Sequence, residues 1–156
     1  MELAAVLKEF SAAVESGDGR RLAALFTPDG VYHDTFYGEF KGPEAIREML
    51  EGRFYRDADK FLWDFFEPVS DSKLAYAKWA FSYTSKMPQS AGKRVAFEGV
   101  SQFELSGGKI RHYGEVFNSG AAFVQLGLEP ARMEKVLRRQ VDALRGQARF
   151  TRHFAG

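Results

Sequence analysis

The stretch "EFSAAVESGDGRRLAALFTPDGVYHDTFYGEFKGPEAIREML" spans residues 9–50 and carries most of the signals that decide the fold. It lies across an amphipathic pattern over residues 2–16, where apolar residues at helical spacing predict a first helix. Gly17 suits the C-cap of that helix, and Asp18 suits the N-cap of a second one. The second helix is expected to be short and to run through Phe26.

The same stretch then changes from helix to strand and back to helix. "TPDG" at residues 27–30 is typical of a turn, and a short strand is predicted at residues 31–34, followed by a reversal into roughly residues 39–41. Gly42 and Pro43 predict the start of a third helix, because proline suits the first helical position. Its buried stripe is predicted to be Ile46, Met49 and Leu50.

Four strand-like segments follow, at residues 61–69, 74–87, 94–105 and 110–118. Pro68 indicates a bulge or an edge, and the inward parity of its segment stays open. In the other segments alternation places on one face Ala75, Ala77, Trp79, Phe81 and Tyr83, then Phe97, Gly99, Ser101, Phe103 and Leu105, and it places Tyr113, Glu115 and Phe117 opposite His112, Gly114 and Val116. Helices followed by an antiparallel meander predict an α+β fold: a cone-shaped, strongly bent antiparallel sheet around the N-terminal helices.

The end of the chain predicts one extra helix. It begins at Glu129 and Pro130, and its apolar stripe is Met133, Val136, Leu137, Val141 and Leu144. We expect one domain at residues 1–128, with the helix and tail at residues 129–156 packed on the same domain. The apolar side of the helix is expected to cover either the mouth of the cone or a partner subunit.

Composition limits the classes of function. A chain of 156 residues with 45% hydrophobic residues can bury a core by itself. Its net charge of +1 gives no reason to expect nucleic acid or an anionic membrane as a partner. The lack of cysteine fits the cytoplasm, and three histidines make a multi-histidine metal site hard to build. No bilayer span or signal peptide is expected, and no cofactor or metal.

Residues 9–50, the segment "FEGVSQFELSGGKIRHYGEVFN" at 97–118, and the paired strands between them resemble the NTF2-like superfamily. That superfamily includes SnoaL-like polyketide cyclases, ketosteroid isomerases, scytalone dehydratase and limonene-epoxide hydrolase. The resemblance covers about residues 3–120. It implies the cone-shaped fold and a homodimer through the outer face of the sheet, whose positions include Tyr76, Lys78, Val100, Gln102 and Val116.

The resemblance also implies where an active site lies. The general base of the ketosteroid isomerases falls on Asp34, in the strand ahead of the helix that starts at Gly42. The oxyanion-binding Tyr of their first helix matches Phe10 here, and their second acid falls near Ser101. Because both isomerase donors are replaced, the match argues against a true ketosteroid isomerase.

A second carboxyl group makes acid–base chemistry plausible. If the last strand keeps the parity of the family, Glu115 and Asp34 enter one cavity, with Tyr113 beside them. Two carboxyl groups in one dry site push their pKa values apart, so one acts as a base and the other as an acid or orienting group. Tyr32, Tyr113 and Ser101 are candidate donors to an oxyanion. The walls would be Trp63, Trp79, Phe81, Phe97 and Phe117.

Two functions therefore stay open. The first is a cofactor-independent isomerase, cyclase, dehydratase or hydrolase that acts on a small apolar molecule with Asp34 as base. The alternative is a non-catalytic protein that binds a small ligand or assembles as a dimer. In that case Asp34 would be an ordinary strand-end residue, and Glu115 would be exposed or paired with Arg111. His33 and His112 fall on the opposite parity and are expected at the surface or an interface.

Overall fold

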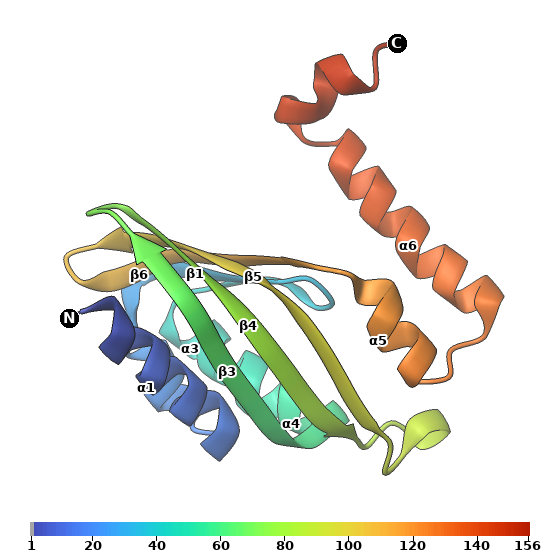
Figure 1. Cartoon of the computed structure of the whole chain (residues 1–156), viewed down its shortest axis with the longest axis horizontal. Coiled ribbons are helices and arrows are strands. Elements are labelled where there is room, and N and C mark those ends of the chain that lie inside the picture. Colours follow the sequence, from blue (N-terminus) through green and yellow to red (C-terminus); the bar gives the residue numbers. More distant parts are fainter. Residues whose placement is uncertain (1) are drawn as a thin grey trace.

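The computed structural model describes residues 2–156 and confirms the α+β fold class (Figure 1). The described helices are α1 (Leu3–Ser16), α2 (Gly19–Ala23), α3 (Pro43–Glu48), α4 (Tyr55–Asp57), α5 (Ser119–Gln125) and α6 (Pro130–Arg145), with a π-helical segment (Met49–Phe54) and 3-10 turns at Pro88–Ser90 and Ala148–His153. The strands are β1 (Phe26–Asp34), β2 (Gly38–Lys41), β3 (Ala58–Ser70), β4 (Leu74–Ser85), β5 (Arg94–Ser106) and β6 (Lys109–Phe117).

The strands form one bent, unclosed sheet in the order β2-β1-β6-β5-β4-β3. β3 to β6 are the antiparallel meander that the sequence predicts, and β2 is an antiparallel edge strand on β1. The pairing of β1 with β6 is parallel, which the sequence did not reveal. In Figure 1 the strands arch over α1, α3 and α4, so one face of the sheet is covered by helices.

Side chains from the covered face of the sheet and from the helices form the core. Ala75, Ala77 and Trp79 on β4 are buried as predicted, while Tyr76 between them is exposed. The apolar face of α1 packs against this layer through its buried residues Val6, Leu7, Phe10 and Val14. Each large side chain buried in this way contributes roughly 1.5–3 kcal/mol to folding, so the layer holds the bent sheet against the helices.

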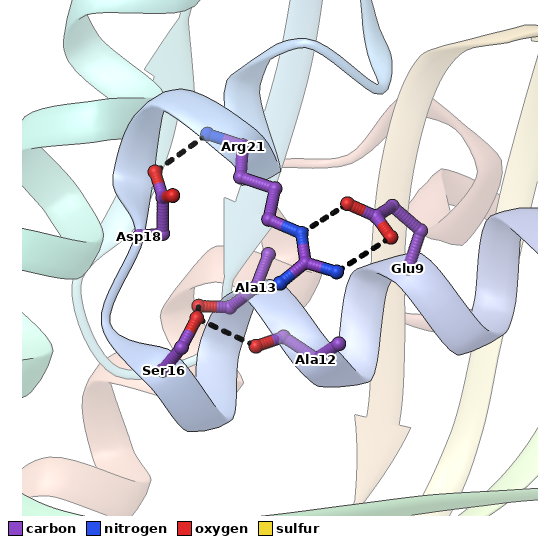
Figure 2. Close-up of polar contacts among 6 residues, drawn as sticks. All are labelled: Glu9, Ala12, Ala13, Ser16, Asp18 and Arg21. Atoms are coloured by element: carbon purple, nitrogen blue, oxygen red, sulfur yellow. Dashed lines mark hydrogen bonds and ion pairs between the residues drawn. The ribbon is translucent and has the colours of Figure 1, made fainter.

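The junction between α1 and α2 is held by polar contacts that the sequence partly predicts (Figure 2). Gly17 caps α1 in the left-handed conformation, with φ 71°. The Asp18 carboxylate accepts a 2.9 Å hydrogen bond from the backbone N–H of Arg21 and so caps α2. The guanidinium of Arg21 in turn forms an ion pair with Glu9 on α1, with an Nη2 to Oε2 distance of 2.8 Å. These contacts join α1 to α2 just before the chain enters β1.

Three boundaries differ from the prediction. α2 ends at Ala23, and residues 27–30 belong to β1, where the register with β6 shifts between Phe26 and Val31. The proline and glycine of this segment are accommodated because the shift interrupts the ladder there. β3 begins at Ala58, and its register with β4 shifts between Phe66 and Val69, which confirms the bulge expected around Pro68.

The C-terminal part contains one helix that was not predicted and one that was. α5 follows β6 directly and buries Ala122 and Phe123. α6 extends away from the sheet in Figure 1, and no residue of this helix is buried. Hydrogen bonds between the side chains of Ser119 and Gln140 join it to α5. The expected packing of residues 129–156 on the domain stays a prediction. Within residues 2–156, no helix is long and apolar enough to cross a bilayer.

Candidate active site

The hairpin between β1 and β2 positions Asp34. Asp34 is the last residue of β1 and pairs with Gly38 across a three-residue loop. Its Oδ1 accepts hydrogen bonds of 2.8 Å from the backbone N–H groups of Phe36 and Tyr37. Gly38 has φ 92°, a conformation that favours glycine, so the loop closes in this shape without strain. Asp34 is 4% exposed and is therefore not a solvated carboxylate at a strand end.

Glu115 lies on β6 and is held by a chain of hydroxyl groups. The Tyr113 hydroxyl donates a 2.8 Å hydrogen bond to Oε2 of Glu115, and the Ser101 hydroxyl lies 2.9 Å from the Tyr113 oxygen. Because the O–H of Tyr113 already donates its hydrogen bond to Glu115, the Ser101 hydroxyl is the donor in the second bond. Arg111 is not the partner of Glu115. It pairs with Glu104, where the register of β5 and β6 shifts between Glu104 and Leu105.

Both carboxyl groups face one cavity of about 70 Å³, which has room for several water molecules. Eight of the ten expected site residues line it: Tyr32, Asp34, Trp63, Trp79, Phe81, Phe97, Glu115 and Phe117. The other two, Tyr113 and Ser101, are fully buried: the Tyr113 hydroxyl bonds to Glu115, and the Ser101 hydroxyl bonds to Tyr113. Their expected role as direct donors to an oxyanion stays a prediction; in this structure their hydroxyl groups form a chain that ends on Glu115.

The surroundings raise the pKa values of the two carboxyl groups by different amounts. Burial raises the pKa of Asp34 to about 6, and the N–H groups of Tyr37 and Phe36 limit that rise by stabilising the carboxylate. Burial raises the pKa of Glu115 further, to about 8, with the negative charge of Asp34 as the second cause and the Tyr113 hydroxyl opposing it. Both shifts favour a state in which the pair holds one proton, and the two N–H donors on Asp34 favour Asp34 as its ionised member.

Three buried hydrogen-bond donors on the cavity lining have no partner among residues 2–156. They are the Tyr32 hydroxyl and the indole N–H groups of Trp63 and Trp79. Burial and the nearby carboxylates keep the pKa of Tyr32 well above its usual value, so its hydroxyl stays protonated. An unpaired buried donor costs about 1–3 kcal/mol, and an acceptor atom on a bound molecule would recover part of that cost.

Sequence reasoning missed part of the lining. The additional lining residues are Phe36, Tyr37, Phe54, Ala58, Phe61 and Tyr83. Tyr83 was available from the alternation of its strand, whereas Phe36 and Tyr37 lie in the loop that closes the hairpin. The Tyr37 hydroxyl donates a 2.5 Å hydrogen bond to Asp57, so it is already committed. Phe10, which replaces the isomerase tyrosine, is fully buried and packs against the rings of Tyr32 and Tyr113.

Comparisons with known families and structures agree with the fold. The model of the SnoaL-like domain matches residues 7–113, more than half of the chain, and the chain belongs to this family of the NTF2-like superfamily. A search of curated protein sequences gave no significant match. The family match leaves the C-terminal helix α6 outside the shared domain.

Solved structures with the same fold share little sequence with the chain. TsrD from Streptomyces laurentii is 19% identical, with a TM-score of 0.70 over 81% of this chain and 98% of that one. A hypothetical protein from Catenulispora acidiphila with a ketosteroid isomerase-like fold, in complex with trimethylamine, is 18% identical, with a TM-score of 0.71 over 80% and 93%. An LEH-like epoxide hydrolase from M. tuberculosis is 18% identical, with a TM-score of 0.63 over 78% and 86%. At these identities the likeness establishes the fold alone.

Proposed function

We propose that this SnoaL-like protein catalyses proton transfer on a small, largely apolar carbonyl compound, with Asp34 as the base and Glu115 as the acid. The observation that carries the proposal is the presence of two carboxyl groups in one aromatic cavity, one held by backbone N–H groups and the other by a tyrosine hydroxyl. The reaction is cofactor-independent, because each step needs only groups that can hold or release a proton.

The proposed reaction begins with removal of a proton by Asp34 and continues with donation of a hydrogen bond or proton to the carbonyl oxygen. Asp34 takes a proton from a carbon next to the carbonyl group, and the C–H electron pair moves into a new C=C bond while the carbonyl oxygen gains negative charge. Glu115 or the unpartnered Tyr32 hydroxyl donates to that oxygen. If Asp34 returns its proton to another carbon of the conjugated enol, the enol O–H gives its proton back to the donor as the C=O bond reforms, and the product is an isomer. If the enol carbon instead attacks a second carbonyl group, the C=O electron pair of that group moves to its oxygen, which takes the proton from Asp34, and the ring closes as the enol O–H proton returns to the donor.

The two N–H groups on Oδ1 of Asp34 serve this role directly. They fix the carboxylate on the hairpin and leave Oδ2 outside these bonds to approach the substrate. They also limit the rise of its pKa, so that the group is ionised at neutral pH although it is buried. A base whose pKa lies near the working pH accepts a proton and releases it again with little loss.

The lining restricts the substrate. Apart from the two carboxyl groups and three phenols, the walls are hydrocarbon and indole rings, which favour a flat, uncharged ring system. A substrate with a fixed negative charge would meet the Asp34 carboxylate in a dry site, where like charges repel strongly. We therefore place the substrate among neutral cyclic or aromatic ketones.

The direct test is exchange of carbon-bound protons for deuterium. A panel of neutral cyclic ketones is incubated with the protein in D₂O, and exchange next to the carbonyl is followed by NMR. We expect exchange above the buffer rate for a subset of the panel, with a loss of roughly 100-fold or more in Asp34→Asn and a smaller loss in Glu115→Gln. Asp29→Asn is the matched control, since Asp29 lies on the same strand but is exposed.

The outcomes separate the two functions. Exchange that survives Asp34→Asn unchanged, or no exchange for any ketone, contradicts the catalytic proposal. If ketones raise the melting temperature without exchange, the cavity binds ligands and does not catalyse proton transfer.

A further inference from the structure

Three side chains on the outer face of the sheet meet at its β2-β1-β6 edge. His33 on β1 and Glu39 on β2 are direct partners in the antiparallel ladder, and His112 lies on β6, the other neighbour of β1. One ligand atom from each residue lies within 4.8 Å of the other two. His33 Nδ1 is 3.5 Å from Glu39 Oε1, and the two imidazole rings have centroids 6.5 Å apart.

We propose that His33, Glu39 and His112 form a binding site for a divalent ion of the zinc type. Imidazole nitrogen and carboxylate oxygen are ligands that Zn²⁺ takes at about 2.0–2.2 Å, which places two donors of a tetrahedral site about 3.4 Å apart. The pair of His33 and Glu39 already has that separation. The His112 nitrogen lies within 4.8 Å of the other two ligand atoms, so it has to approach by at most about 1.4 Å, a change within reach of a side-chain rotation.

The backbone supplies the geometry of this site. Three adjacent strands each present one ligand on the same face, and the sheet fixes the spacing between them. Two imidazole nitrogens and one carboxylate favour Zn²⁺, Co²⁺ or Ni²⁺ over Mg²⁺ and Ca²⁺, which prefer oxygen ligands. Arg111, the neighbour of His112 on β6, forms an ion pair with Glu104.

The site is open to solvent and separate from the cavity. The side chains of His33 and Glu39 are 50% and 64% exposed, so an ion can enter without opening the fold. Three protein ligands leave a fourth position for water or for a group from another molecule. His33 and Asp34 are neighbours on a strand and point to opposite faces, so the ion would join the three strands from outside and take no part in the proposed proton transfer.

The test uses the untagged full-length protein and Zn²⁺ or Co²⁺ alone. We expect calorimetry to show one ion per chain, and Co²⁺ to develop the visible absorption of a nitrogen- and oxygen-bound ion. At a hundredfold excess over Kd, Zn²⁺ is expected to raise the melting temperature by about 5–10 °C. Mg²⁺ at the same concentration is expected to cause no rise.

Variants decide which residues hold the ion. His33→Ala and His112→Ala should each weaken binding by roughly 100-fold or more, and Glu39→Gln by roughly 10-fold or more. His153→Ala is the matched control, because His153 is the third of three histidines and the chain has no cysteine. All four side chains are partly or fully exposed, so the variants should fold, and their metal-free melting temperatures check this.

Two results would overturn the site. The first is the absence of saturable Zn²⁺ binding, which would leave His33 and Glu39 as a simple surface contact between strands. The second is unchanged binding in the double variant of His33 and His112, or loss of binding in His153→Ala. Deuterium exchange by the cavity is measured separately, so failure of the metal site and failure of the proposed catalysis are distinguishable.

Discussion

The hydroxyl of Tyr113 donates a 2.8 Å hydrogen bond to Oε2 of Glu115, two positions further along β6. Residues two apart on a strand share a face, so this bond is a direct product of strand geometry. Tyr113 is fully buried, and its own oxygen is held by Ser101 on the neighbouring strand. The orientation of the cavity acid is therefore set by two residues that do not line the cavity.

Removal of the hydrogen bond from Tyr113 to Glu115 should change both the pKa of Glu115 and the stability of the protein. In Tyr113→Phe the pKa of Glu115 should rise further, because the hydroxyl stabilises the ionised form. Buried groups left unpaired should lower the free energy of unfolding by about 1–3 kcal/mol. The pH profile of deuterium exchange and urea unfolding measure the two effects. Ser101→Ala keeps the bond to Glu115 and should shift the pH profile less; an equal shift in both variants would argue against the orienting role.

The carboxyl pair should make stability fall as pH rises. Both groups have pKa values raised by the fold, from 3.8 to about 6 for Asp34 and from 4.5 to about 8 for Glu115. Between these limits the folded chain binds more protons than the unfolded chain, so the contribution is fully present below pH 4 and is lost as pH rises to about 8. At pH 8.5, the free energy of unfolding of Asp34→Asn, measured by urea unfolding, should exceed that of the wild type by about 1–3 kcal/mol.

The matched measurement for this prediction is made at pH 4 on the same two proteins. There the wild-type carboxyl groups are largely protonated, so the advantage of Asp34→Asn should shrink. Other carboxyl groups, such as those of Glu9 and Asp71, have lowered pKa values and affect both proteins alike. An advantage that does not depend on pH would contradict a raised pKa at Asp34.

Gly99 leaves the space that Trp79 occupies beside the cavity. A Cβ atom at Gly99 would lie 2.5 Å from Cζ2 of Trp79 and 2.6 Å from the backbone oxygen of Val116. Gly99→Ala should therefore destabilise the fold by about 1–3 kcal/mol and displace the indole. Gly114→Ala is the control on the next strand, because the nearest atom to its Cβ would be 3.7 Å away. Equal melting temperatures for the two variants would contradict this packing.

Deletion of residues 129–156 should cost little stability. No residue of α6 is buried, and the helix joins the rest of the chain through α5. We expect a chain ending at Leu128 to melt within a few degrees of the full chain, measured by circular dichroism. A much lower melting temperature would show that residues 129–156 are an integral part of the domain.

The fold was largely predictable because burial follows alternation along strands. The inward positions of residues 74–85 and 94–105 fall opposite one another in the ladder, as Trp79 and Gly99 do, and periodicity alone identifies them. The helix caps at Gly17 and Asp18 were predictable for a similar reason, since their chemistry is local. Strand alternation and helix caps depend only on residues close together in the sequence, so the sequence predicts them.

The rest depends on pairing between distant segments. Nothing local indicates that β1 lies parallel to β6, and this pairing brings His33 close to His112. Arg111 pairs with Glu104 because the register of β5 and β6 shifts next to Glu104, and the sequence alone does not show that shift. Asp34 and Glu115 could be proposed as two members of one site only through the resemblance to a known superfamily, and their relation to Tyr113 and Ser101 required coordinates.

The parallel pair of β1 and β6 also bears on how the chain reaches its native state. Val31 and its partner His112 are 81 positions apart, so the middle of the sheet closes only over a very long loop. Such non-local pairing raises contact order and slows folding. During synthesis on the ribosome, β1 would emerge well before β6, and the edge of β1 that pairs with β6 would stay without its partner strand until then. The cavity, whose two acids lie on these two strands, can form only after synthesis has passed the last strand.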